Sequence, residues 1–308
     1  MNNVSYYLLL DHIKIHGANA ISSPLTYGFP AITGFLGAIH ALSRKTESIY
    51  HEAIYLDGVM IACYDCDVQV YRKNDFADYR FKLTRNPIGK DGKPKAIIQE
   101  GKVHLDVSLV IEVRCNSQLF VEQEQKIAFE SWIKQQLLQQ RMAGGSVLSI
   151  DNVWLFDAMK DPQEIIKRLL PAYVLIDANQ QLQAITQELQ AINPEMTGLD
   201  ALVETAKLHY IPSEDGWQTQ SVKKDRGWLV PIHMGYQAIS PLFEKGAVAH
   251  IRDEQCHAQF VECLYGLGQW VFPYRLIGNF DGAFWRYRSM LAENDANLYL
   301  IQQDKINI

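Results

Sequence analysis

A single stretch, residues 103–113, constrains the fold of this chain more than any other. Apolar side chains occupy every second position of it, namely Val103, Leu105, Val107, Leu109, Ile111 and Val113. Such strict alternation is typical of a β-strand that buries one face in a core. We therefore predict a strand here, with a β-sheet as the framework of the fold.

Other apolar patterns predict the elements that flank this strand. Residues 6–15 begin as a continuous apolar run and then alternate, which favours a strand, and alternation predicts further strands at 60–70 and 147–156. Apolar residues recur at helical spacing in 32–44 and 123–142. The residues expected on the buried faces of these two helices are Ile32, Phe35, Leu36, Ile39, Leu42, Phe129, Trp132, Ile133 and Leu137.

Two Asp-Gly pairs predict turns. Asp57-Gly58 precedes the strand at 60–70 and is expected to open it. Asp91-Gly92 lies between two extended arms, which is a strong signal for a β-hairpin. The order of elements over residues 1–156 is then β-α-β-hairpin-β-α-β, as in a ferredoxin-like split βαβ domain, and the hairpin projects from it at about 72–102.

Residues 157–308 are expected to form a second, C-terminal α+β subdomain with helical and β segments. Their patterns predict helices near 163–170, 183–191 and 199–209, a loop at 212–227, and strands at 228–239 and 260–276. These elements do not define a topology by themselves.

Aromatic residues gather near the C-terminus, interleaved with arginines. They are Tyr265, Trp270, Phe272, Tyr274, Phe280, Phe284, Trp285 and Tyr287, with Arg275, Arg286 and Arg288 among them. Such a stretch can form an ordinary core, a protein interface or a stacking surface for single-stranded RNA. The core and the interface are the plainer interpretations.

Positive charge is concentrated in residues 72–102. This segment holds nine Lys or Arg residues against four Asp or Glu residues, a net charge of +5, whereas the rest of the chain carries −11. The overall net charge of −6 argues against bulk, non-specific binding to nucleic acid. A basic projection on an acidic body instead indicates a local contact with a polyanion, and it leaves the acidic surface for protein partners. A solvated hairpin is the plainer alternative.

The composition, with 48% hydrophobic and 21% charged residues, is that of a soluble globular protein. No apolar run approaches the ~20 residues of a membrane span, and the N-terminus lacks the basic segment of a signal peptide, so we expect a cytoplasmic protein without membrane contact. The five cysteines are scattered, and reduced thiols are expected. Cys63 and Cys66 form a C-x-x-C pair, but within a strand this spacing predicts opposite faces and no disulfide or zinc site.

Residues 16–30 form a long segment without Lys or Arg. Its polar side chains can hydrogen-bond a ligand, namely Asn19, Ser22, Ser23 and Thr26. Tyr27 and Phe29 can stack on one, and the helix that begins near Thr33 offers free backbone N–H groups to a phosphate. A packed loop that caps the core would have the same residue types.

Histidines near the N-terminus are candidates for general acid–base chemistry, as in RNA cleavage without metal: His12, His16, His40 and His51. His40 lies on the predicted helix 32–44, on a face apart from its apolar stripe, where an ordinary surface histidine is the plainer interpretation. The sequence contains no Walker loop, HExxH motif or nucleophile elbow. No metal and no cofactor are expected.

Several motifs together resemble a known family. The run ANAISSPLTYGFP (18–30), followed by FLGAIHAL, is similar to the signature of the second Csy subunit of type I-F CRISPR surveillance complexes, a Cas-five-type family of the RAMP superfamily. The similarity continues in LTRNP (83–87), Asp91-Gly92, EGKVHLDVSL (100–109), AGGS (143–146), GWLVPI (227–232), GYQAIS (235–240) and FVECLYGLGQW (260–270). It covers nearly the whole chain in order, except for 157–226, where little beyond helical character is shared.

The resemblance implies a ferredoxin-like, RRM-like RAMP domain with a β-hairpin thumb, in which Gly144-Gly145 is the glycine-rich loop of the superfamily. It implies a non-catalytic subunit that binds the 5′ handle of the crRNA and pairs with the large, Cas-eight-type subunit to form the tail of the complex. It also implies contact with a backbone, Cas-seven-type subunit and, through the assembled complex, with target DNA in interference against foreign DNA.

The expected RNA-binding residues combine the loop with the basic thumb, where Lys and Arg would hold phosphates while Asn, Ser and Tyr read bases. They are His16, Asn19, Ser22, Ser23, Thr26, Tyr27, Lys73, Arg80, Arg85, Asn86, Lys93 and Lys95. An alternative from another class of function is a RAMP-type, metal-independent endoribonuclease that processes CRISPR repeat RNA with His16 or His40, since some members of the superfamily cleave RNA.

Overall fold

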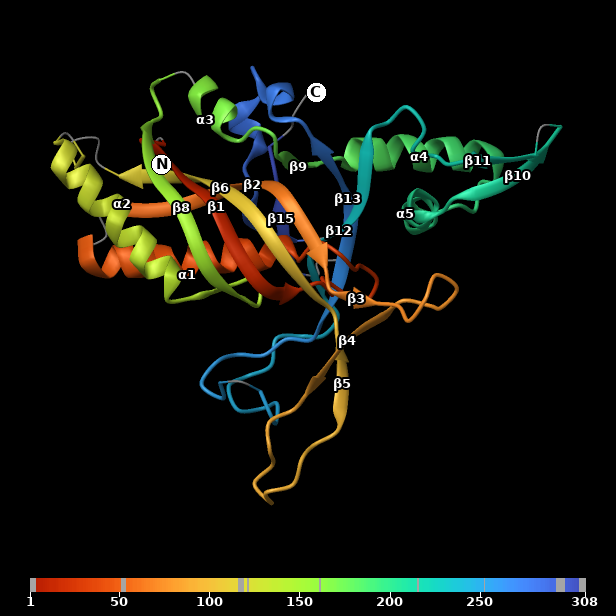
Figure 1. Ribbon diagram of the computed structural model, residues 1–308, viewed down its shortest axis with the longest axis horizontal. Helices are drawn as coiled ribbons and strands as arrows, with labels where there is room; N and C mark the ends of the chain where they lie inside the picture. The colour runs from red at the N-terminus through yellow and green to blue at the C-terminus, as the bar shows by residue number, and fades with distance from the viewer. Residues whose placement is uncertain are drawn as a thin grey trace. The chain divides into compact units, whose positions relative to one another are not determined.

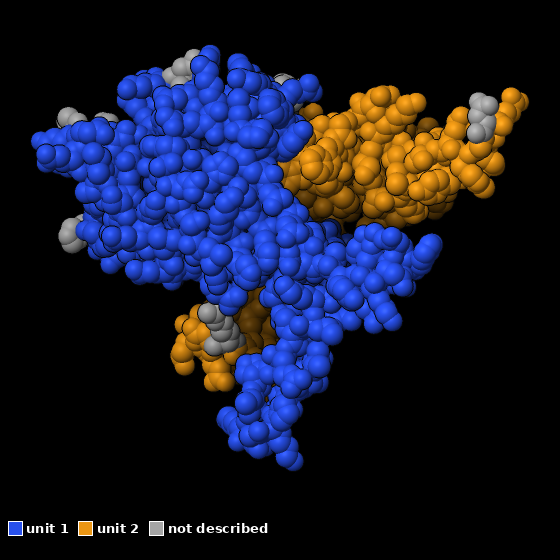
Figure 2. Space-filling view, in the orientation of Figure 1, with its two compact units in different colours: residues 1–175, 271–284, 307–308 blue, residues 176–270, 285–306 orange. Residues whose placement is uncertain are grey.

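The computed structural model of the chain describes residues 4–50, 54–115, 119–120, 122–160, 162–214, 216–251, 253–291 and 297–304. It is a mixed α/β structure with a large antiparallel sheet (Figure 1). Two compact units are distinguished in Figure 2. The first contains the described residues up to Leu175 together with Val271–Phe284, and the second contains Ile176–Trp270 and the described residues from Trp285 onward. The first unit thus extends past residue 156, where the sequence placed a boundary.

The sheet of the first unit runs in the order β2-β6-β1-β8-β7, and each neighbouring pair is antiparallel. Its strands are β1 (Tyr6–Asn19), β2 (Ile54–Val68), β6 (Lys102–Cys115), β7 (Arg141–Met142) and β8 (Gly145–Asp157). The helices of this unit are α1 (Ile32–Tyr50), α2 (Gln123–Leu138) and α3 (Gln163–Arg168). The four strands and two helices predicted for this region are confirmed, with shifted ends.

β6 lies in the middle of this sheet, between β2 and β1. Its alternation predicted one buried face, and all six apolar residues of 103–113 are buried. From Asp106 onward the alternate positions are buried as well, so both faces of the strand are covered. Residues from late in the chain pack on the neighbouring strand β1, where Phe280 and Phe284 lie against Tyr7 with ring centroids 5.1 and 5.4 Å away.

The helices bury the faces that the sequence predicted, with one exception. The predicted stripe of α1 is buried, as are Phe129, Ile133 and Leu137 of α2, but Trp132 is only half-buried. Helix α2 also ends at Leu138, before the predicted end at 142, because the chain turns there into the short strand β7.

The prediction that Asp57-Gly58 opens a strand is wrong. β2 runs through the pair, and the register with β6 shifts between Leu56 and Val59. This register shift is a β-bulge, and two side chains of β6 bond its polar groups. The Glu112 carboxylate accepts from the Gly58 N–H at 3.2 Å, and Arg114 Nε lies 2.9 Å from Asp57 Oδ2. An Asp-Gly pair can thus sit inside a strand where neighbouring side chains satisfy it.

The prediction that Cys63 and Cys66 point to opposite faces is also wrong. A second register shift lies between Cys63 and Asp65, so that Cys63 pairs with Val107 and Cys66 with Leu105. Those partners lie two positions apart on β6, hence on one face of the sheet. Both cysteines are free thiols, and burial raises the pKa of Cys66 to about 11.

The predicted thumb is a small sheet of its own, formed by β3 (Val70–Tyr71), β4 (Arg80–Arg85) and β5 (Ile97–Glu100). β4 and β5 pair antiparallel from Lys82–Glu100 to Arg85–Ile97, and Figure 1 shows them extending away from the main sheet. Gly92 has φ +70° in the segment that joins them, but this loop spans residues 86–96 and is no two-residue turn.

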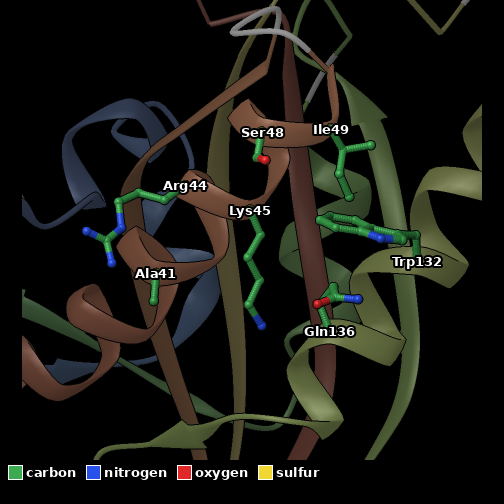
Figure 3. Close-up of a pocket in the computed structure, with 7 residues that line it drawn as sticks. All are labelled: Ala41, Arg44, Lys45, Ser48, Ile49, Trp132 and Gln136. Atoms are coloured by element: carbon green, nitrogen blue, oxygen red, sulfur yellow. The ribbon is translucent and has the colours of Figure 1, made fainter.

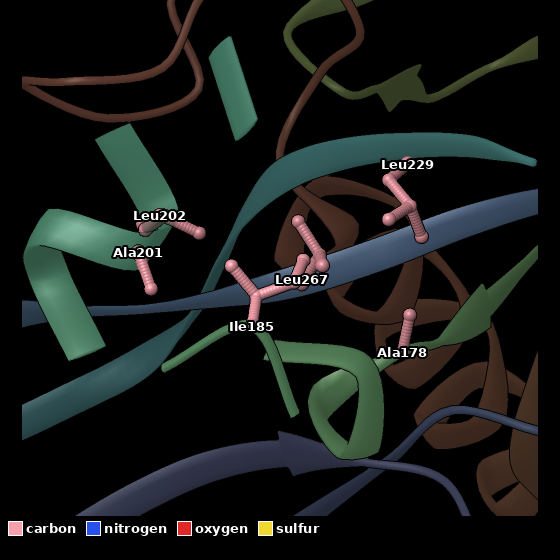
Figure 4. Close-up of a cluster of buried hydrophobic side chains, with 6 residues drawn as sticks. All are labelled: Ala178, Ile185, Ala201, Leu202, Leu229 and Leu267. Carbon is pink, nitrogen blue, oxygen red and sulfur yellow. The ribbon is translucent and has the colours of Figure 1, made fainter. Parts of the chain in front are cut away.

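Four strands of the second unit lie in one sheet in the order β14-β15-β12-β13. These are β12 (Trp228–Ala238), β13 (Val261–Val271), β14 (Arg286–Leu291) and β15 (Asn297–Gln302), and the helices α4 (Asn179–Ile192) and α5 (Gly198–Ala206) precede them in the chain. Its core is the cluster in Figure 4, formed by Ala178, Ile185, Ala201, Leu202, Leu229 and Leu267. The three predicted helices correspond to α3, α4 and α5. The loop predicted at 212–227 is partly a hairpin of β10 (His209–Ser213) and β11 (Gly216–Gln220), which corrects that prediction.

The aromatic stretch near the C-terminus is mainly core. Trp270, Phe280, Phe284 and Trp285 are buried, whereas Phe272 and Tyr274 are exposed. Its last two arginines are occupied by one carboxylate, since Arg286 and Arg288 lie 3.1 and 2.8 Å from the oxygens of Asp304. Most of these side chains are therefore not available as a stacking surface.

Candidate nucleic-acid interface

The loop after β1 is held by its own hydroxyl groups. Ile21 and Tyr27 form an isolated β-bridge across it. Thr26 Oγ1 lies 2.6 Å from both Ser22 Oγ and Ser23 Oγ, and Ser23 Oγ also accepts from the Thr26 N–H at 3.0 Å. Three of the predicted RNA-binding side chains thus bond to one another, so a ligand would have to compete with these bonds.

Asn19, at the end of β1, is positioned differently. Its backbone N–H donates to the carbonyl of Ala143 at 2.9 Å, and its side-chain oxygen accepts from the Ile21 N–H at 3.2 Å. The side chain is exposed, and its amide nitrogen has no hydrogen-bond partner within the described part of the chain. This NH₂ group can donate two hydrogen bonds to a ligand.

The glycine-rich turn before β8 packs closely on the start of α1 and the end of β1. A Cβ on Gly145 would lie 2.8 Å from the backbone nitrogen of Ala18. The Gly34 carbonyl of α1 accepts from the Ala143 N–H at 3.3 Å. Gly144 adopts φ +80°, which favours glycine. These backbone contacts fix the position of Asn19.

Tyr27 joins the loop to the base of the thumb. Its ring centroid lies 5.0 Å from that of Phe81 on β4, and a Cβ on Gly101 would lie 3.2 Å from its ring edge. Tyr27 as a whole remains 46% exposed. Part of its stacking surface is therefore used inside the protein.

His16 is stacked on His104 of β6, with ring centroids 4.0 Å apart. His104 in turn accepts at Nδ1 from the Gly17 N–H at 3.1 Å. Lys82 of β4 is close enough to contribute to the lowered pKa of His104, of which burial is the main cause. Two predicted residues, His16 and Tyr27, are thus brought to the base of the thumb.

A second polar cluster lies further along β1 and β6. His12 Nδ1 donates to the Asp106 carboxylate at 3.0 and 3.1 Å, and Lys14 Nζ bonds the same carboxylate. The His12 ring stacks on Tyr64 of β2 at 4.0 Å. The carboxylate of Asp106 is buried and holds this group together. Of the other histidines proposed for acid–base work, His40 is exposed on α1 and His51 lies outside the described residues.

The thumb cations fall into two groups. Arg72, Lys95 and Lys102 are paired with carboxylates, of Asp75 at 3.0 Å, Asp91 at 3.4 Å and Glu100 at 3.6 Å. Other predicted residues are exposed and have no ion pair among the residues described: Lys73, Arg80, Arg85 and Lys93, with Asn86 also exposed. The second group, together with Lys82 and Lys90, which are also exposed without an ion pair among the described residues, is the free positive charge of the thumb. Within the described residues, no hydrogen bond or ion pair joins Lys73, Lys93 or Lys95 to the loop 16–30.

The sequence prediction missed His104, Phe81 and Lys82. His104 occupies one of the alternate positions of 103–113, between the apolar residues, and the polar character of these positions, apart from Val110, was visible in the sequence. That signal marks a sheet face, but pairing with His16 depends on the register of β1 against β6, in which Ala18 lies opposite Val103.

A separate hollow lies between α1 and α2, with a volume of ≈ 430 Å³ (Figure 3). It is lined by Ala41, Arg44, Lys45, Ser48 and Ile49 of α1 and by Trp132 and Gln136 of α2. In Figure 3 the Lys45 side chain extends toward Gln136, whereas Arg44 points away from α2. None of the predicted RNA-binding residues lines it.

The part of the chain that the structure describes contains neither a cluster of potential metal ligands nor a helix suited to span a membrane. Its residues contain no group of three or more His, Cys, Asp or Glu side chains arranged to hold a metal ion. Among the helices that the structure describes, none is both long and apolar enough to cross a membrane.

Comparison with known proteins relates nearly the whole chain to one family. Residues 8–301 match the model of the family described as CRISPR-associated protein (Cas_Csy2). The chain is also 36% identical, over 317 aligned residues, to the CRISPR-associated protein Csy2 of Pseudomonas aeruginosa (strain UCBPP-PA14), covering 95% of this chain and 93% of that protein. The chain therefore belongs to the Cas_Csy2 family of CRISPR-associated proteins.

Proposed function

We propose that this chain is a non-catalytic, RNA-binding subunit of a type I-F CRISPR surveillance complex, in which it holds the 5′ handle of the crRNA. Membership of the Cas_Csy2 family over residues 8–301 is the observation that carries this proposal. The activity serves interference against foreign DNA, which the assembled complex contacts as its target.

The chemistry of the thumb base and loop supports RNA as the ligand. Free cations such as Arg80 and Arg85 on the thumb suit phosphates, which give affinity without sequence information. The exposed amide of Asn19 and the ring of His16 suit the edges and faces of unpaired bases. A single-stranded handle offers both kinds of group to one surface.

The strand order supports a ferredoxin-like, RAMP-type core for this subunit. β1, β2, β6 and β8 follow one another with α1 after the first and α2 after the third, and β6 lies between β2 and β1. This order agrees with the one expected of a split βαβ fold and so supports the proposed core. The thumb is inserted between β2 and β6, whose ends pair at Val68 and Val103.

Exposed apolar side chains support protein partners. Phe76, Met159 and Ile192 are all more than 80% exposed, and the chain outside the thumb segment is acidic. The partners proposed are the large, Cas-eight-type subunit, with which this chain forms the tail of the complex, and a backbone, Cas-seven-type subunit on the same crRNA.

The alternative of an endoribonuclease using His16 or His40 has less support. General acid–base catalysis requires an acid and a base that reach the same reacting group. His16 is stacked on His104, whereas His40 is exposed on α1, and no contact joins the two within the described residues. We therefore propose no catalytic role for either histidine.

Binding and cleavage can be tested together with the full-length chain. Fluorescence anisotropy would compare a labelled RNA carrying the repeat-derived 5′ handle with a scrambled RNA of equal length. The same RNA would be incubated with the protein in EDTA and resolved on a denaturing gel, with His16→Ala and His40→Ala variants in parallel.

The proposal expects tighter binding to the native handle and intact RNA in all lanes. Equal affinity for both RNAs would contradict handle recognition. Site-specific cleavage that disappears in either histidine variant would establish the endoribonuclease instead. Co-expression with the large subunit should also yield a stable complex, and failure of the two chains to co-purify would contradict the proposed pairing.

A further inference from the structure

Two imidazole rings lie face to face at the base of the thumb. The rings of His16 and His104 have centroids 4.0 Å apart and planes inclined by 19°. They come from neighbouring antiparallel strands, β1 and β6. Parallel rings at this distance form a stacked pair rather than an edge contact.

The His104 ring of the pair is held by a hydrogen bond from the backbone. The Gly17 N–H donates to His104 Nδ1 at 3.1 Å, so this nitrogen carries no proton and Nε2–H is the donor of the neutral ring. Gly17 has φ +66°, a conformation that glycine adopts without strain. Burial, and then the neighbouring His16, lower the pKa of His104, in keeping with a neutral ring.

The His16 ring, by contrast, has few partners within the protein. His16 is exposed, and within the described residues no ring other than His104 and no hydrogen bond involves its side chain. One face of this imidazole is therefore backed by His104, and the exposed remainder of the side chain is accessible to a ligand. An exposed ring held flat in this way is the geometry on which an unstacked nucleobase can rest.

The surroundings suit a nucleotide. Lys82 of β4 lies close enough to His104 to contribute to its lowered pKa, and its Nζ donates to Gln69 Oε1 at 3.3 Å. The Lys82 cation is available to a phosphate, since the group that accepts this hydrogen bond is a neutral amide. Tyr27, the more obvious stacking residue of the sequence, already packs on Phe81 with ring centroids 5.0 Å apart.

We infer that the His16–His104 pair is a stacking platform for one unpaired nucleobase of the bound RNA. His16 contacts the base, and His104 is a positioning residue that holds the His16 ring flat. This inference rests on the proposed RNA-binding function and assigns a site within it. The contact is aromatic in character, so it requires a ring at position 16 and does not require a charge there.

The test measures the affinity of the full-length chain for the labelled handle RNA in five proteins: wild type, His16→Ala, His16→Phe, His104→Ala and His104→Phe. Stacking predicts that His16→Ala weakens binding by about 5- to 150-fold, while His16→Phe stays near wild type. His104→Ala should weaken binding by less, and His104→Phe should restore it because a ring again supports His16.

Single abasic substitutions along the handle locate the base and separate stacking from damage to the fold. At one position, loss of the base should weaken binding to the wild type and to His16→Phe but should have no effect on His16→Ala. A purely structural role of His16 would not create this dependence. Thermal melting of each variant reports whether the fold is kept.

Three results would overturn the inference. Undetectable binding by the wild type would overturn it together with the proposed function. Normal binding by the wild type and by His16→Ala would overturn the platform alone. A reduction of affinity in His16→Phe as large as in His16→Ala, in a folded protein, would show that the imidazole acts through charge or hydrogen bonding and would also overturn the platform.

Discussion

A Cβ atom on Gly34 would lie 2.8 Å from the Cα of Ala143, closer than real Cβ atoms approach a backbone atom. The first turn of α1 and the glycine-rich turn before β8 are therefore in direct backbone contact. Ala143 also accepts a hydrogen bond from the Asn19 N–H at 2.9 Å. This contact connects the helix layer to the loop that carries the candidate RNA-binding residues.

Replacing Gly34 by alanine should destabilise the protein. The new methyl group meets backbone and cannot be accommodated by rotating a side chain, and such overpacking typically costs about 1–3 kcal/mol. Gly37→Ala is the matched control, because it lies on the same helix and a Cβ there has no neighbour within 4 Å. It should stabilise by about 0.4–1 kcal/mol, because alanine restricts the unfolded chain more than glycine does. Thermal melting should thus shift in opposite directions, and equal shifts would contradict the close approach of the two backbones.

The free cations of the thumb should set the salt dependence of RNA binding. Arg80, Arg85 and Lys93 are exposed without an ion pair among the described residues, so each is available to bind a phosphate. Replacing them by Gln should lower the log–log salt slope by roughly 0.7 for each phosphate that the protein no longer neutralises. Anisotropy titrations of the handle RNA from low to moderate salt measure this slope.

The thumb supplies its own control for that experiment. Gln at positions 72, 95 and 102 removes the same number of charges, but Arg72, Lys95 and Lys102 are already paired with carboxylates. The slope should change less in this variant than in the first. An equal change in both would mean that net charge, and not binding of particular phosphates, determines affinity.

His233 should make the protein less stable in mild acid. It is buried on β12, and burial lowers its pKa below the usual ~6.5 of histidine. The unfolded state then binds the proton more readily than the folded state, so stability is lost as pH falls through ~6.5, by at most about 1.4 kcal/mol per pH unit. Urea unfolding between pH 8 and 5 should show this slope, and His233→Phe should flatten it. An unchanged slope in the variant would assign the effect to other groups.

Periodicity predicted the first unit well because its core elements are long. β6, α1 and β8 each contain several repeats of their pattern, so the residues that face the core could be named in advance. Asp57-Gly58 was misread for a physical reason, since the side chains that satisfy it, Glu112 and Arg114, lie on a strand more than 50 residues later. Short strands such as β10 and β15 carry too few residues to establish a period.

The sequence predicted which types of residue occur in the candidate site, but not which of them contact one another. The sequence showed hydroxyl groups at 22, 23 and 26, but not that they bond to each other. It also showed two histidines, at 16 and 104, whose stacking depends on strand register. Which side chains remain free for a ligand follows from tertiary structure alone.

Variants at Asn19 and Ser22 should therefore distinguish a loop residue that recognises the RNA from one that only stabilises the loop. Asn19→Ala removes an exposed amide whose nitrogen has no partner among the described residues, so it should cost about 1–3 kcal/mol of binding on the native handle, with little effect on a scrambled one. Ser22→Ala instead removes a bond to Thr26, which should lower stability by about 0.5–1.5 kcal/mol while discrimination between the two RNAs stays the same.

Affinity for both RNAs and thermal melting would be measured for each variant. An equal decrease in affinity for native and scrambled RNA in Asn19→Ala, with unchanged melting, would show that the amide does not read the handle. Reduced discrimination in Ser22→Ala would show that the hydroxyl cluster opens to meet the RNA.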